Sequence, residues 1–128
     1  MLDRFPVYAV LPTADLARSR AWWEEKVGMT PAMEDPGGLW YSCGDGTWFV
    51  ITSSQFAGTA QNTAASFKVP DLLSLMADLR ARGVVIEDYD IPGFKTVDGL
   101  FEYGDYRAAW FKDCDGNIVE VGQVPKRS

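Results

Sequence analysis

Hydrophobic positions along this chain follow two periods. Short apolar runs rich in β-branched and aromatic residues, bounded by glycine, proline or aspartate, predict strands. The expected strands cover 7–11, 29–34, 39–43 and 47–53 in the first half, and 64–69, 84–87, 106–112 and 117–122 in the second. Two other segments place apolar residues three or four positions apart, which indicates amphipathic helices that pack on a core by one face.

Both expected helices have start and stop signals. The first spans 16–27, follows the N-cap residue Asp15 and ends at Gly28. The second follows Asp71 and ends at Gly83. Its apolar residues recur at i, i+3, i+4 and i+7, namely Leu72, Leu75, Met76 and Leu79. Each half of the chain therefore has the predicted order βαβββ.

A sequence pattern that occurs twice supports this division. Trp40, Asp45-Gly46 and Val50 recur with the same spacing as Trp110, Asp115-Gly116 and Glu120, and Ala14-Asp15-Leu16 is matched by Pro70-Asp71-Leu72. A duplicated unit predicts a fold with two-fold pseudo-symmetry. We expect a single domain over 1–128, with module one at about 6–54, a linker at about 55–62 and module two at about 63–123.

Composition excludes several classes of function. The formal charge is −6, which disfavours a nucleic-acid partner, and no apolar run approaches the roughly 20 residues of a membrane span. The first ten residues lack the features of a signal peptide, so we expect a cytoplasmic protein. The chain has no histidine, which removes catalytic triads and most transition-metal sites. Cys43 and Cys114 are expected to be reduced packing residues.

The whole pattern resembles the vicinal oxygen chelate superfamily, the group of glyoxalases, bleomycin-resistance proteins and extradiol dioxygenases. The resemblance is carried by two βαβββ modules, the Asp-Leu helix entries and the Asp-Gly-Asn-Ile-Val-Glu of the last hairpin, and it covers residues 6–122. It implies an α+β fold in which two curved mixed sheets carry helices on their outer faces. It also implies a homodimer, because in the bleomycin-resistance type the partner helps to form the binding groove.

Metal-using members take one ligand from the first strand and one from the last strand of each module. The matching positions here are Tyr8, Val50, Ala64 and Glu120. Only Glu120 is a usual ligand, and divalent metals need several nitrogen or oxygen donors in fixed geometry. We therefore expect neither a metal nor another cofactor at these positions.

Strand alternation then predicts what lines the cavity between the sheets, because side chains two positions apart share a face. If Glu120 faces the cavity, the same face carries Trp48, Val50, Thr52, Ser66 and Lys68. Tyr8, Trp40, Trp48 and Trp110 would form an aromatic box suited to flat or cationic organic molecules. The alternative is that these rings simply fill a cavity that has lost its metal. Phe49, Ile51, Phe67, Val69, Val119 and Val121 are expected to face the helices.

Glu120 is open to several roles. It can pair with Lys68, meet a cationic ligand, or act as a general base with Tyr8 or Tyr103 as proton donor. Pairing or ligand contact is favoured over catalysis, because no second acid–base partner is evident. The long segment 88–105 is either a lid that closes on ligand or a surface loop that packs Phe94 and Leu100 onto the domain or onto a dimer partner.

We therefore expect a metal-free small-molecule-binding protein of the glyoxalase/bleomycin-resistance type, with an aromatic or cationic organic ligand. The alternative is a metal-independent isomerase, lyase or cyclase with Glu120 as catalytic base. A metal-dependent glyoxalase or dioxygenase fits least. The expected ligand-binding residues are Tyr8, Trp40, Trp48, Val50, Thr52, Ser66, Lys68, Tyr103, Trp110 and Glu120.

Overall fold

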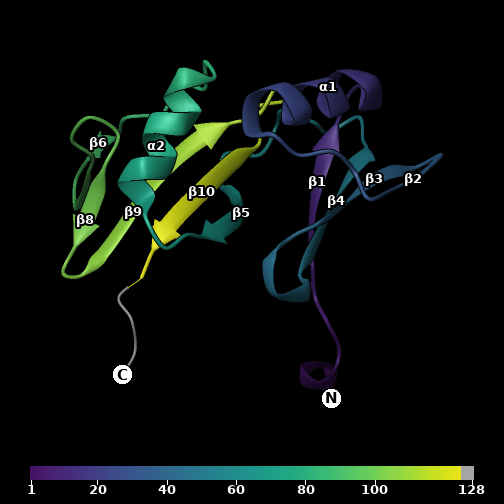
Figure 1. Ribbon diagram of the computed structural model, residues 1–128, viewed down its shortest axis with the longest axis horizontal. Coiled ribbons are helices and arrows are strands. Elements are labelled where there is room, and N and C mark those ends of the chain that lie inside the picture. The colour runs from purple at the N-terminus through teal and green to yellow at the C-terminus, as the bar shows by residue number, and fades with distance from the viewer. Residues whose placement is uncertain (125–128) are drawn as a thin grey trace.

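A computed structural model describes residues 1–124 and contains two four-stranded mixed sheets that lie side by side, as Figure 1 shows. The first sheet has the order β1-β4-β3-β2, with β1 (Ala9–Thr13), β4 (Trp48–Ser53), β3 (Gly38–Ser42) and β2 (Met33–Asp35). The second has the order β5-β10-β9-β8, with β5 (Thr63–Lys68), β10 (Ile118–Gln123), β9 (Tyr106–Lys112) and β8 (Phe101–Tyr103). These sheets and the helices α1 (Leu16–Val27) and α2 (Leu72–Ala81) confirm the expected α+β fold.

Both helices begin and end where the sequence predicts. The Asp15 side chain accepts a hydrogen bond from the Arg18 backbone N–H, and Asp71 accepts one from the Ser74 N–H, so each aspartate satisfies a free donor of the first helical turn. Gly28 ends α1 with φ 69°, a left-handed conformation that glycine adopts without a steric penalty.

The strand register confirms the repeat. Trp40 on β3 lies opposite Val50 on β4, and Trp110 on β9 lies opposite Glu120 on β10. In each sheet the last strand pairs in parallel with the first, so Val10 is level with Val50 and Ser66 is level with Glu120. Tyr8 comes two residues before Val10, and Ala64 comes two residues before Ser66. The first-strand positions matched to metal ligands are therefore not level with the last-strand positions, Val50 and Glu120.

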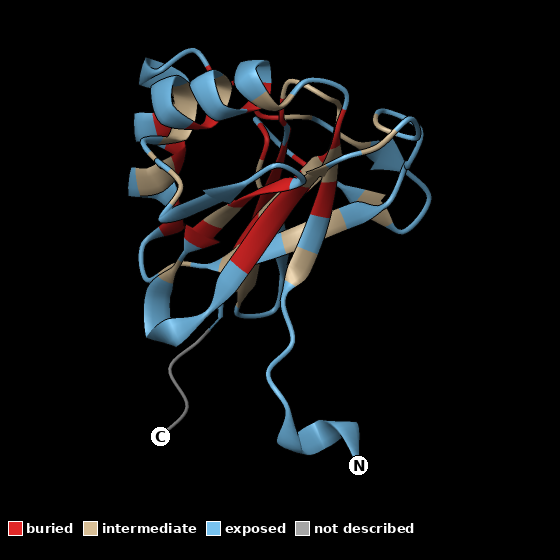
Figure 2. Cartoon of the chain, turned by 90° about the vertical axis from the view of Figure 1, so that its right-hand side faces the viewer, coloured by how far each residue is buried: buried red, intermediate tan, exposed pale blue. Residues whose placement is uncertain are grey.

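The helix-covered faces of the two sheets share one hydrophobic core. Phe49 and Phe67, from different sheets, make an edge-to-face contact with ring centroids 5.9 Å apart. Trp22 on α1 stacks on Phe111 of the second sheet at 6.2 Å, so the first helix packs on both modules. Figure 2 shows this buried zone between the helices and the strands, whereas the N-terminal segment before β1 is exposed. No helix within residues 1–124 is long and apolar enough to cross a membrane.

The expectation was wrong in the region before β9. The expected strand at 84–87 is reduced to an isolated bridge between Ile86 and Phe111. The strand that pairs with β9 instead is β8, inside the segment expected to be a loop. That segment also forms a hairpin of β6 (Asp90–Ile91) and β7 (Phe94–Lys95). Because β8 pairs with the N-terminal part of β9, residues 84–87 contact only the C-terminal part of that strand. The first strand also begins later than expected, so Val7 and Tyr8 precede β1.

A single carboxylate ties the second module to the start of α1. Asp115, in the turn between β9 and β10, accepts hydrogen bonds from the Thr13 hydroxyl at 2.6 Å and the Ala14 N–H at 3.0 Å. The Arg18 guanidinium on α1 also donates to it, at 2.7 Å. The Asp115 side chain is only 1% exposed. Burial raises its pKa, but these donors outweigh burial, and the pKa is lowered overall.

We predict that Asp115→Asn lowers the free energy of unfolding by about 2 kcal/mol, because a hydrogen-bonded buried charge is replaced by a neutral amide. Asp45→Asn is the matched control, since Asp45 is the repeat counterpart, is exposed and lies in a left-handed conformation that asparagine tolerates. Urea denaturation measures both. Because the folded pKa of Asp115 is depressed, its contribution is complete above the unfolded value of about 3.9 and is lost as the pH falls through the folded pKa. The gap between wild type and Asp115→Asn should therefore close in acid, and a gap that is independent of pH would contradict this account.

Candidate functional site

The Glu120 side chain is held in place by two hydroxyl groups. The Ser66 hydroxyl donates to Oε1 at 2.5 Å, and the Tyr106 hydroxyl donates to Oε2 at 2.8 Å. Ser66 is level with Glu120 on the neighbouring strand β5, and Tyr106 comes from β9 on the other side. Both carboxylate oxygens thus accept a hydrogen bond, which fixes the orientation of the carboxylate. The expected pairing of Glu120 with Lys68 is not among the ion pairs of residues 1–124.

Tyr106 was not expected at the site. Burial, with the hydrogen bond and negative charge of Glu120 acting in the same direction, raises the pKa of Tyr106 to about 12. The phenol therefore keeps its proton near neutral pH and remains a donor to Glu120. The signal in the sequence is positional, because residue 106 is four positions before Trp110 on one strand and shares its face.

A glycine opposite makes room for this tyrosine. A Cβ at Gly122 would lie 3.2 Å from the Tyr106 hydroxyl oxygen, closer than an ordinary van der Waals contact. Any side chain at residue 122 would therefore push the phenol away from Glu120. Ser66, Glu120 and Tyr106 thus form one hydrogen-bonded group on the second sheet.

The structure does not assemble the expected aromatic box. Tyr8 and Trp40 meet edge to face, with ring centroids 5.3 Å apart, on the face of the first sheet that points away from the helices. Trp110 instead lies in a separate cluster, with its centroid 5.1 Å from Phe94, 5.9 Å from Tyr89 and 6.0 Å from Phe101. Trp110 is buried, because the β6–β7 hairpin folds over this face of the second sheet.

The segment 88–105 packs on the domain as one of the two alternatives predicted. The Asp88 carboxylate accepts hydrogen bonds from the Thr96 hydroxyl at 2.8 Å and from the Gly99 N–H at 2.7 Å, so the hairpin is closed at its base. Phe94 stacks on Phe101 at 4.6 Å, and Leu100 packs against the core. Tyr103 is 78% exposed at the outer edge of the second sheet, so the structure does not bring it to Glu120.

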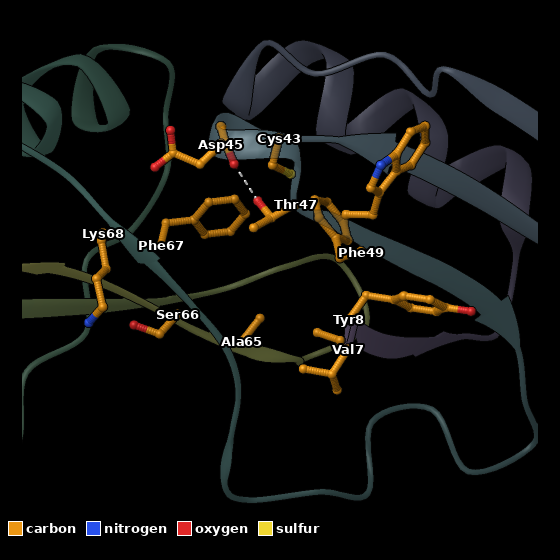
Figure 3. Close-up of a pocket in the computed structure, with 13 residues that line it drawn as sticks. Val7, Tyr8, Cys43, Asp45, Thr47, Phe49, Ala65, Ser66, Phe67 and Lys68 are labelled. Atoms are coloured by element: carbon orange, nitrogen blue, oxygen red, sulfur yellow. Dashed lines mark hydrogen bonds between the residues drawn. The ribbon is translucent and has the colours of Figure 1, made fainter. Parts of the chain in front are cut away.

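A cavity of about 440 Å³ lies between the two sheets, below the contact between Phe49 and Phe67. Its wall includes four of the expected ligand-binding residues, namely Tyr8, Trp48, Ser66 and Lys68. Figure 3 shows Phe67 in the middle of the site, with Lys68 and Asp45 toward one end and Tyr8 toward the other. Ser66 lines this cavity and also donates to Glu120. A single hydrogen bond therefore joins the cavity wall to the Glu120 carboxylate.

The other expected residues lie outside the cavity wall. Val50 is buried at 3% exposure, and Thr52 is half-buried near the end of β4. Trp40 is half-buried and donates its indole N–H to Asp35. Glu120 and Trp110 lie on β10 and β9, whereas the cavity is lined from the second sheet by residues of β5. Trp48 is 38% exposed, which leaves its indole ring accessible to a ligand.

The residues at the four matched positions do not fit a metal ion. Val50 and Ala64 carry no donor atom, and Tyr8 precedes β1 with its ring against Trp40. Within residues 1–124 there is no group of three or more histidine, cysteine, aspartate or glutamate side chains placed to hold a metal. Glu120 alone supplies a usual ligand, and its oxygens already accept from Ser66 and Tyr106.

Solved structures identify the fold. Over 93% of the chain, it matches 92% of a lactoylglutathione lyase of Agrobacterium tumefaciens with a TM-score of 0.69 and 15% identity. It matches 99% of a glyoxalase/bleomycin resistance protein of Catenulispora acidiphila over 94% of its length, with a TM-score of 0.68 and 19% identity. It also matches 96% of TnmS3, an antibiotic-binding protein of a Streptomyces species, over 94% of its length, with a TM-score of 0.66 and 20% identity.

The chain therefore has the fold of glyoxalase/bleomycin-resistance proteins, which is the fold that the resemblance in its sequence implied. No protein-family model and no curated protein matches the sequence. At these levels of identity the structural likeness establishes the fold, and the function has to be argued from the site.

The hydrogen bond between Tyr106 and Glu120 can be tested by titration. We predict that Tyr106 titrates near 12, and that Glu120→Gln moves its pKa down toward the ordinary value of about 10, because a negative charge and a strong acceptor are lost. Two-dimensional NMR of protein labelled at the tyrosine rings measures this for each residue. Tyr103, which is exposed, serves as the internal control. An unchanged Tyr106 pKa in Glu120→Gln would show that the two groups do not interact.

Proposed function

We propose that this protein binds a flat, aromatic small molecule, preferably a cation, without using a metal. The observation that carries the proposal is the cavity between the sheets, because one of its lining residues, Ser66, donates a hydrogen bond to the Glu120 carboxylate. The Ser66 hydroxyl gives its proton to Glu120, so its oxygen is left to accept from a ligand N–H. Tyr8 and Trp48, both partly exposed, supply aromatic surface beside it.

Size and charge agree with such a ligand. A cavity of about 440 Å³ is in the range of small-molecule sites, which bury most of a ligand of a few rings. The negative charge of Glu120 and the faces of Tyr8 and Trp48 both attract organic cations. The antibiotic-binding protein among the matching structures supports a binding role on this fold. The homodimer remains a prediction of the sequence.

Binding is a better match to the geometry than catalysis by Glu120. A general base has to lie within hydrogen-bond reach of the proton that it takes, whereas Ser66 lines the cavity and Glu120 does not. Tyr106, with its pKa raised to about 12, is poorly suited to release a proton near neutral pH. The role that remains for the Glu120 carboxylate is to hold a fixed negative charge near the ligand.

A pair of probes with one ring shape and different charge tests the proposal. Proflavine is a planar cation and acridone is its neutral three-ring counterpart, and fluorescence titration measures the dissociation constant of each. We expect wild-type protein to bind both, and Glu120→Gln to weaken proflavine binding about tenfold, because an attractive charge is lost. Acridone binding should change less than twofold.

Glu24→Gln is the control, because Glu24 is an exposed carboxylate on α1. It should leave the binding of both probes unchanged. If wild-type protein binds neither probe, the proposed function is wrong. If Glu120→Gln weakens both probes equally, the carboxylate acts on the shape of the cavity rather than on ligand charge, which contradicts the proposed preference for cations.

A further inference from the structure

The two modules do not make the same contact where each meets the other. The turn after β9 reaches the start of α1, and the turn after β3, related to it by the repeat, is directed toward the end of β5 before α2. We call the first place the closed junction, defined by Asp115 with Thr13, Ala14 and Arg18. Its counterpart, the open junction, is defined by Asp45 and the segment 68–74.

Each donor that holds Asp115 is missing from the open junction. By the spacing from the N-cap residues, Thr13 corresponds to Val69, Ala14 to Pro70 and Arg18 to Ser74. Valine has no hydroxyl group and proline has no backbone N–H. Serine replaces the guanidinium, and its own N–H is bound by the N-cap Asp71. Among residues 1–124, the Asp45 carboxylate therefore has no counterpart of the three bonds made by Asp115.

A second brace is also missing. At the closed junction the Asn117 side chain donates to the Pro12 carbonyl and to Asp113, both at 2.9 Å, which ties the turn to β1. The counterparts of Asn117 and Asp113 are Thr47 and Cys43. The Thr47 hydroxyl donates within its own turn, to the Gly44 carbonyl at 2.6 Å, and so does not reach β5.

The cavity lies where these contacts are lost. One wall contains Cys43, Asp45 and Thr47 of the turn, and the facing wall contains Phe67 and Lys68 of β5, as Figure 3 shows. Asp45 is exposed, and among residues 1–124 neither Asp45 nor Lys68 takes part in any of the ion pairs. Asp115 is thus paired at the closed junction, whereas its counterpart Asp45 is available at the open junction beside an aromatic cavity.

We propose that Asp45 is the cation-recognition residue of this cavity, and that the ligand carries an amidinium or guanidinium group on an aromatic ring. That group would meet Asp45 as Arg18 meets Asp115, because a planar fork of N–H donors matches a carboxylate. The aromatic body of the ligand would lie against Phe67, with Ser66 as a further acceptor. This inference rests on the proposed function and adds a residue and a ligand chemistry to it.

Lys68 gives the proposal a second consequence. Lys68 lines the same cavity from the wall that faces Asp45, so its positive charge repels a bound cation. Removal of this charge should therefore improve the binding of a cation, whereas a site for anions would show the opposite result.

The test is titration of full-length protein with p-aminobenzamidine, a fluorescent aromatic amidine. Asp45→Asn should weaken binding at least tenfold, and Lys68→Gln should strengthen it two- to fivefold. Asp98→Asn is the matched control, because Asp98 is also exposed and left-handed, at φ 51° against 55° for Asp45. It lies on the far side of the second module and should have no effect.

A fourth variant supplies the missing group from the chain itself. Ser74→Arg places a guanidinium at the position equivalent to Arg18, on an exposed helical residue that tolerates a long side chain. It should compete with p-aminobenzamidine for Asp45 and weaken binding, and it should do so less in the Asp45→Asn background.

The outcomes separate this inference from the proposed function. If proflavine binds and responds to Glu120→Gln, but Asp45→Asn leaves p-aminobenzamidine binding unchanged, the role of Asp45 is wrong and the proposed function stands. If Lys68→Gln weakens the binding of the amidine, the cavity does not recognise cations at this end. If neither proflavine, acridone nor p-aminobenzamidine binds wild-type protein, the proposed function itself fails.

Discussion

The buried carboxylate of Asp115 is the contact on which the arrangement of the two modules depends. It takes three donors from the other module, including the guanidinium of Arg18 and the backbone N–H of Ala14 at the entry to α1. A buried carboxylate is costly unless its oxygens are satisfied, so these donors fix the turn after β9 against the first module. With that junction fixed, α1 lies across both sheets and Trp22 reaches Phe111. The shared core follows from this placement.

Because the two modules are repeats, the contact that Asp45 lacks can be compared directly with the contact that Asp115 makes. Both turns carry an Asp-Gly pair, but only the second turn meets a threonine hydroxyl, a backbone N–H and an arginine. The first turn meets Val69 and Pro70, which offer no such donors. The cavity between the sheets therefore lies at the junction where these contacts are absent. The proposed recognition of a cation by Asp45 rests on this difference between the two junctions.

Much of the fold was predictable because its determinants are local. The N-caps Asp15 and Asp71 and the terminating Gly28 act on neighbouring residues, and the alternation along β4 and β10 correctly assigned Phe49, Ile51, Val119 and Val121 to the core. The repeat placed Trp40 and Trp110 at equivalent positions, and in the structure they lie opposite Val50 and Glu120 respectively. Each of these features depends on spacing within one element or one hairpin.

The details of the site were less predictable because they depend on contacts between distant segments. The aromatic box failed because the hairpin at 90–95 brings Phe94 onto Trp110, and nothing in the spacing of the strands indicates where such a hairpin will fold. Tyr106 was missed because its importance depends on Gly122 opposite, which leaves space for the phenol to reach Glu120. The sequence showed Asp45 only as part of the repeated pattern, because its availability becomes evident from comparison with the bonds of Asp115 in three dimensions.

The difference between the two junctions can be measured directly by chemical labelling of carboxyl groups. Native protein would be treated with a water-soluble carbodiimide and glycinamide, and the rate of modification at each aspartate followed by mass spectrometry of its peptides. The account predicts rapid labelling of Asp45, which is exposed, and protection of Asp115, whose side chain is 1% exposed, until the protein is unfolded. Equal rates for Asp45 and Asp115 in the native protein would contradict it.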